Sequence, residues 1–155
     1  MKPALWVMIT IRVGCSLLLL FCSSMAAVTQ DVLSSIEGSI KNNEPTWQLS
    51  AKERQPKSTI YRWKAGNENV VAEVFVTSSK QAASDLLQEH AFRVPVPPKQ
   101  KLKDLGDEAL LYQSGSAANG MILFRRSNVF ILLTGSSLSH ARRFANHIVN
   151  VIPDR

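Results

Sequence analysis

Residues 121–134, MILFRRSNVFILLT, contain two apolar runs separated by a short polar stretch. The dipeptide Ser127-Asn128 lies in that stretch, and Asn tolerates the left-handed backbone conformation that a tight hairpin turn needs. The second run, residues 129–133, is apolar at every position. Such a run is typical of a central strand with both faces covered. The segment therefore predicts a β-hairpin at the centre of a sheet.

Upstream of this hairpin, the sequence predicts three more strands. Residues 58–64 and 70–77 alternate in side-chain character around Gly66-Asn67-Glu68, which is the pattern of an antiparallel hairpin. Residues 109–113 form a short strand that precedes the central hairpin. Residues 46–57 are polar and irregular, and their few large apolar side chains indicate either a short strand or a pinned loop. We therefore expect about five strands.

Three amphipathic helices are predicted around these strands. Apolar side chains recur at helical spacing in each of them. Ser78 and Gln81 fit a capping box at the start of the second helix. The three segments are residues 29–41, a helix from Ser78 that ends by Val94, and a helix capped by Ser136 or Ser137 that ends before Pro153. Helices between runs of strands indicate an α+β domain with an antiparallel sheet, over residues 27–155.

The N-terminal residues 1–26 are typical of a secretory signal peptide. Lys2 and Arg12 supply positive charge, an apolar run follows, and Ser24 and Ala26 are the small residues expected before a cleavage site. The alternative is an uncleaved membrane anchor. An anchor would place Arg12 near the middle of the membrane, at a cost of about 2.5 kcal/mol or more. We therefore expect export, to the periplasm or the medium.

Removal of the signal peptide changes the composition of the protein. Cys15 and Cys22 both lie in it, so the remaining chain has no thiol for a disulfide, a nucleophile or a metal. The whole chain carries a net charge of +6, of which Lys2 and Arg12 supply two charges. A moderately basic exported domain is a poor candidate for binding nucleic acid.

The last third of the chain resembles small exported bacterial α+β domains of unknown function. The resemblance rests on residues 105–109 (LGDEA), residues 124–129 (FRRSNV) and a following helix with Ala141, Phe144 and Ala145. Those domains more often have Gly before the Asn of the hairpin turn, where this chain has Ser127. The resemblance implies the fold and no site residues.

Few side chains point to catalysis or metal binding. His140 and His147 are seven residues apart on one helix, about 10 Å along its axis, which is too far for one metal ion. We expect them on a solvated helix face, and His90 as a charge at a helix end. Asp104, Asp107 and Glu108 are the acidic cluster that a calcium ion would need, although a solvated turn is favoured.

No nucleophile elbow and no phosphate-binding glycine loop occurs in the sequence, and we expect no cofactor. Two groups of basic side chains remain as candidate contacts for an anionic partner. In an extended chain, alternate residues share one side. The candidates are Lys99, Lys101 and Lys103 in one row, and Arg125, Arg126, Arg142 and Arg143 around the hairpin and the last helix.

These observations favour a non-enzymatic binding or accessory module of the cell envelope. Its partner would be a protein or an anionic envelope component. Two alternatives stay open. One is a small hydrolase or transferase whose site assembles only in the fold, with a His and a carboxylate in one pocket. The other is a peripheral protein that contacts the membrane surface through its basic side chains.

Overall fold

The computed structural model describes residues 29–113 and 119–154. The expected signal peptide, residues 1–26, lies outside the described residues. Of the described residues, 29–34 and 35–154 belong to two different units. Residues 29–43 are helical, and this helix is slightly longer than the predicted one because Asn42 and Asn43 continue it.

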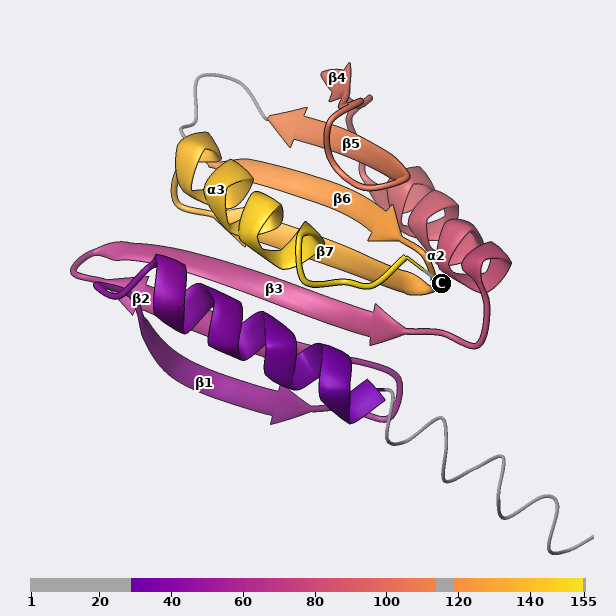
Figure 1. The fold of residues 1–155 in the computed structure, drawn as a ribbon. Coiled ribbons are helices and arrows are strands. Elements are labelled where there is room, and N and C mark those ends of the chain that lie inside the picture. The colour runs from indigo at the N-terminus through magenta and orange to yellow at the C-terminus, as the bar shows by residue number, and fades with distance from the viewer. Residues whose placement is uncertain (1–28, 114–118, 155) are drawn as a thin grey trace, which may run out of the picture. The chain divides into compact units, whose positions relative to one another are not determined.

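Residues 35–155 contain a seven-stranded sheet in which every neighbouring pair is antiparallel (Figure 1). The strand order across the sheet is β1-β2-β3-β7-β6-β5-β4. The strands are β1 (Gln48–Arg54), β2 (Thr59–Ala65), β3 (Glu68–Val76), β4 (Gln100–Lys101), β5 (Glu108–Gln113), β6 (Gly120–Arg126) and β7 (Val129–Gly135). The α+β class is thus confirmed, but the expected number of five strands is too low.

The two additional strands lie at the edges of the sheet. Six of the seven side chains of β1 are exposed, so it lacks the alternation that marks a half-buried strand. β4 has only two residues, both exposed, and follows a proline-rich segment. Edge strands of this kind carry little hydrophobic signal, and pairing with β2 or β5 defines them.

Strand β7 lies between β3 and β6, as its uninterrupted apolar sequence predicts. Helix α2 (Lys80–Arg93) covers one face of the sheet and helix α3 (Leu138–Val149) the other (Figure 1). On the α2 face, Ala83 and Leu87 pack with Leu123 and Phe130. On the α3 face, Trp63 contacts Phe144, with 5.4 Å between ring centroids. Both faces of the sheet therefore contribute to the core.

The N-cap of α2 is Ser79, so the predicted capping box at Ser78 is wrong. The Ser79 hydroxyl accepts a hydrogen bond from the Ala82 backbone N–H at 3.1 Å. Adjacent serines carry the same local signal, and the sequence alone does not separate them. For α3 the N-cap is Ser137, whose hydroxyl accepts from the His140 N–H at 3.2 Å.

The left-handed residue of the β6–β7 turn is Ser127, with φ 55°, and not Asn128 as predicted. A single positive φ at the first turn residue is the pattern of a type II′ turn. Asp107 supports this conformation, because its Oδ2 accepts a hydrogen bond from the Ser127 N–H at 2.7 Å. The segments LGDEA and FRRSNV thus contact each other through this hydrogen bond.

Candidate functional site

A pocket of about 460 Å³ opens on the α2 face of the sheet, beyond the C-terminal end of α2. Its lining comes from the end of β5, the start of β6, the end of β7, the start of β3 and the segment after α2. The lining residues are Asn69, Val94, Pro95, Val96, Tyr112, Gln113, Asn119, Gly120, Met121, Thr134, Gly135 and Ser136.

The strand register builds the floor of this pocket. Tyr112 pairs with Met121, and Met121 pairs with Thr134, so these three side chains lie in one row across β5, β6 and β7. Directly opposite residues of antiparallel strands share one face of the sheet. Helix α2 ends at Arg93 and the chain turns away through Pro95. Among the described residues, no helix therefore covers this row.

The glycines at this end of the sheet allow close packing of α3 on the opposite face. A Cβ on Gly120 would lie 2.8 Å from Leu138 Cδ1 and 3.0 Å from its Cα. Glycine at this position thus permits α3 to begin close to the sheet. The close packing fixes the ends of β6 and β7, and with them the position of the pocket floor.

Tyr112 is the most informative side chain of the pocket. The residue is only 3 % exposed, and burial raises the pKa of its phenol. Within the part of the chain that the structure describes, its hydroxyl makes no hydrogen bond. Tyr112 also lines the pocket. A buried tyrosine hydroxyl usually has a partner, so this group is available to a ligand.

None of the residues that line the pocket is charged. Two charged side chains bond to lining residues. Lys99 Nζ donates to Gln113 Oε1 at 2.7 Å, and the Ser136 hydroxyl donates to Glu68 Oε2. The pocket therefore combines apolar walls with hydroxyl and amide groups, without a charge to neutralise an ionic ligand.

The structure places the four predicted arginines in ion pairs instead of on a free basic surface. Each of them contacts a carboxylate of the same chain. Arg125 pairs with Asp107 at 2.9 Å and Glu108 at 3.4 Å, Arg126 with Asp154 at 3.8 Å, Arg142 with Asp104 at 2.6 Å, and Arg143 with Glu44 at 2.8 Å. An anionic partner would compete with these carboxylates.

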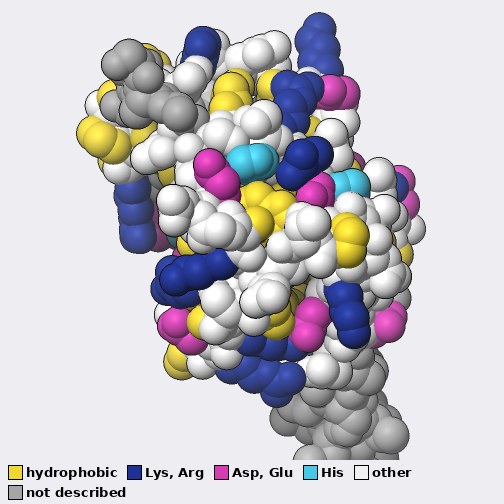
Figure 2. Space-filling model, turned by 90° about the vertical axis from the view of Figure 1, so that its left-hand side faces the viewer, with side chains coloured by type: hydrophobic (Ala, Val, Ile, Leu, Met, Phe, Trp, Pro, Cys, Tyr) yellow, Lys and Arg dark blue, Asp and Glu magenta, His cyan; other side chains and the backbone are white. Residues whose placement is uncertain are grey.

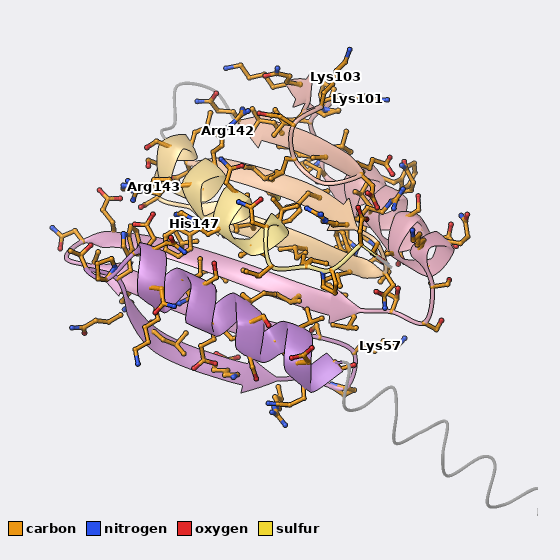
Figure 3. All side chains as sticks on the ribbon, viewed as in Figure 1. Lys57, Lys101, Lys103, Arg142, Arg143 and His147 are labelled. Atoms are coloured by element: carbon orange, nitrogen blue, oxygen red, sulfur yellow. The ribbon has the colours of Figure 1, made fainter. Side chains whose placement is uncertain are left out.

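The three predicted lysines are exposed. Lys101 ends β4 and Lys103 follows it, and neither has an ion pair among the described residues, whereas Arg142 and Arg143 project from α3 (Figure 3). The predicted basic groups thus lie on different elements. On the side drawn in Figure 2, basic and acidic side chains are interspersed.

The predicted solvated face of α3 is wrong for its histidines. His147 Nε2 lies 3.2 Å from Oε1 of the buried Glu44. The His140 ring packs against Trp47, with 5.1 Å between centroids, and its Nδ1 is buried 3.5 Å from Glu68 Oε2. Residues 44–47 pack against α3 through Glu44 and Trp47. Helical spacing alone does not predict this contact, because it depends on the tertiary structure.

His90 is also in a packed environment. Its Nδ1 lies 2.9 Å from the Leu86 carbonyl oxygen, and its ring contacts Phe130, with 5.0 Å between centroids. The acidic residues considered for calcium pair with arginines, as described above. In the described ranges, no group of three or more side chains is arranged to hold a metal ion.

Comparison with known proteins gives a structural likeness and no family. No protein-family model matches the chain, and no curated protein matches it. A solved structure with a similar fold is the GTP-binding regulator from Thermotoga maritima, with a TM-score of 0.52 and 14 % identity. The match covers 76 % of this chain and 86 % of that chain. At this identity, the likeness shows the fold alone.

Proposed function

We propose that this chain is an exported, non-enzymatic binding module, and that its ligand site is the pocket at the end of α2. The observation that carries the proposal is the composition of the pocket. Apolar walls with a few convergent polar groups, in a volume of about 460 Å³, are typical of sites that bind small molecules. The hydroxyl of the buried Tyr112, which has no hydrogen-bond partner in the described ranges, adds a group that a ligand would satisfy.

The positions of the histidines and acids favour binding over catalysis. The pocket lining contains neither a His nor a carboxylate. The His147–Glu44 pair also includes Arg143, which ties the carboxylate into a structural ion pair. Ser136 at the pocket rim donates a hydrogen bond to Glu68, and His140 Nδ1 lies 3.5 Å from the same carboxylate oxygen. Among the described residues the serine therefore contacts the carboxylate and not the histidine, which is not the serine–histidine contact that nucleophilic catalysis needs.

Nucleotide binding is not transferred from the Thermotoga protein. That protein is described as a GTP-binding regulator. Phosphate groups are usually held by Lys, Arg or a row of backbone N–H groups. The pocket of this chain has no Lys or Arg in its lining. An uncharged ligand is the better fit to these residues.

Export rests on the sequence of residues 1–26. In the described residues, no helix is long and apolar enough to cross a membrane. Cell fractionation followed by intact mass measurement tests this part of the proposal. We expect the protein outside the cytoplasm with Ala27 as its first residue. A protein that retains Met1 and stays with the membrane would contradict cleavage.

The ligand site is tested by screening uncharged small molecules for stabilisation of the purified protein. Thr134→Trp is the blocking variant, because the indole would occupy the pocket floor. Thr134→Val is the matched control, since it removes the hydroxyl and keeps the space. We expect hits that stabilise wild type and Thr134→Val and leave Thr134→Trp unchanged. Hits that stabilise all three proteins equally, or a screen without hits, would overturn the assignment of the site.

A further inference from the structure

We infer that the pocket at the end of α2 takes an uncharged, mainly aliphatic small molecule with one hydrogen-bond acceptor, which the Tyr112 hydroxyl holds. This inference rests on the proposed function and adds the class of the ligand. It follows from three properties of the lining: its lack of charge, the buried Tyr112 hydroxyl without a hydrogen-bond partner among the described residues, and its apolar side chains.

The lack of charge excludes ionic ligands from tight binding. A charged group that leaves water needs an opposite charge or several hydrogen bonds in its place. Lys99 and Glu68 are the charged groups bonded to lining residues, and each is already engaged, with Gln113 and Ser136 respectively. Neither is part of the lining. A carboxylate or an ammonium in the pocket would therefore lose its hydration without gaining a compensating ion pair, which disfavours binding.

The Tyr112 hydroxyl determines the polar end of the ligand. A phenol is protonated at neutral pH and can donate a hydrogen bond, and burial raises the pKa of Tyr112 further from this range. The matching group on the ligand is an acceptor such as a carbonyl or ether oxygen. Thr134 lies two strands away in the same row and contributes to the pocket floor.

The apolar walls determine the rest of the ligand. Val94, Pro95 and Val96 form one side, and Met121 lies on the floor between Tyr112 and Thr134. Methionine adapts its shape to what it contacts, and proline holds the wall in a fixed conformation. An aliphatic chain fits these surfaces, and it gains binding energy by leaving water.

Three probes of equal chain length test the charge requirement: hexanamide, hexanoate and hexylammonium at pH 7, titrated into the purified protein by calorimetry. For a ligand of this size we expect a Kd of about 0.1–1 mM for hexanamide. The two charged probes should bind at least about tenfold more weakly. Equal or tighter binding of either charged probe would overturn the inference.

Tyr112→Phe tests the hydrogen bond, with Tyr61→Phe as the matched control because Tyr61 lies in the core on the other face of the sheet. We expect Tyr112→Phe to weaken hexanamide binding by about three- to tenfold, and Tyr61→Phe to leave it unchanged. Unchanged binding to Tyr112→Phe would overturn the role of the hydroxyl.

The failure of this inference is distinct from the failure of the proposed function. The ligand class is wrong and the site is still supported if two results occur together. The first is that no six-carbon probe binds or that the charged probes bind best. The second is that other molecules stabilise wild type but not Thr134→Trp. If no molecule distinguishes wild type from Thr134→Trp, the site itself is wrong.

Discussion

Replacement of Asp107 by Ala should lower the free energy of unfolding, because Asp107 connects two separate turns of the fold. Asp107 Oδ2 accepts hydrogen bonds from the Ser127 backbone N–H at 2.7 Å and from Arg125 Nη1 at 2.9 Å. It therefore joins the segment before β5 to the β6–β7 turn. Asp107→Ala removes both hydrogen bonds and leaves the strands unchanged.

The two bonds contribute unequally. Ser127 is 1 % exposed, so water cannot readily replace the lost partner of its N–H, and an unsatisfied buried donor costs about 1–3 kcal/mol. The ion pair with Arg125 is partly exposed and contributes about 1 kcal/mol or less, because Arg125 retains Glu108. The free energy of unfolding should fall by about 2–3 kcal/mol. In a domain of this size, Tm should fall by about 6–12 °C.

Urea unfolding of three proteins measures this effect. Asp107→Asn is the control, because its amide oxygen still accepts from Ser127 and only the charge is lost; we expect a decrease of about 1 kcal/mol or less. The reasoning is refuted if Asp107→Ala unfolds within 0.5 kcal/mol of wild type. It is also refuted if Asp107→Asn is as unstable as Asp107→Ala, since charge would then matter more than the turn.

Three other changes have defined outcomes. Burial raises the pKa of Tyr61 from 10.0 to about 12. The contribution of the protonated phenol to the free energy of unfolding is therefore complete below pH 10 and is lost as pH rises to 12, so wild type should lose about 2 kcal/mol more than Tyr61→Phe between these pH values. Stability curves of the two proteins that stay parallel over this range would contradict the effect. Gly106→Ala should cost about 2 kcal/mol or more in urea unfolding, because φ is +67° and a Cβ would lie 2.4 Å from the Arg125 carbonyl oxygen; wild-type stability would refute the clash. Glu44→Gln should cost about 1–2 kcal/mol, because the carboxylate is 9 % exposed and bonds to Arg143 and His147; an unchanged urea midpoint would show that this ion pair contributes nothing.

The central part of the fold can be predicted from the sequence because its signal is local. Residues 121–134 contain both strands and the turn that joins them, and residues 129–133 of β7 are apolar because α2 and α3 contact this strand from the two faces of the sheet. β1 gives no such signal. Its exposed side chains reflect a position at the sheet edge, which pairing with β2 determines.

The pocket and the ion pairs depend on the fold as a whole. Tyr112, Met121 and Thr134 come together through the register of three strands, and nothing in their local sequence indicates a shared site. Pro95 is the one local sign, since it ends α2 before the helix covers this row. Arg142 likewise meets Asp104, 38 residues earlier in the chain. Sequence patterns show that such residues are charged but not which of them are already paired.

Chemical-shift mapping with hexanamide tests the central claim most directly. The isotope-labelled protein is titrated with the probe, and the backbone amides that respond are assigned. We predict that the largest shifts occur at Tyr112, Met121 and Thr134, and that they disappear in Thr134→Trp. Shifts that concentrate at Lys101 and Lys103 instead, or that persist in Thr134→Trp, would contradict a ligand site at the end of α2.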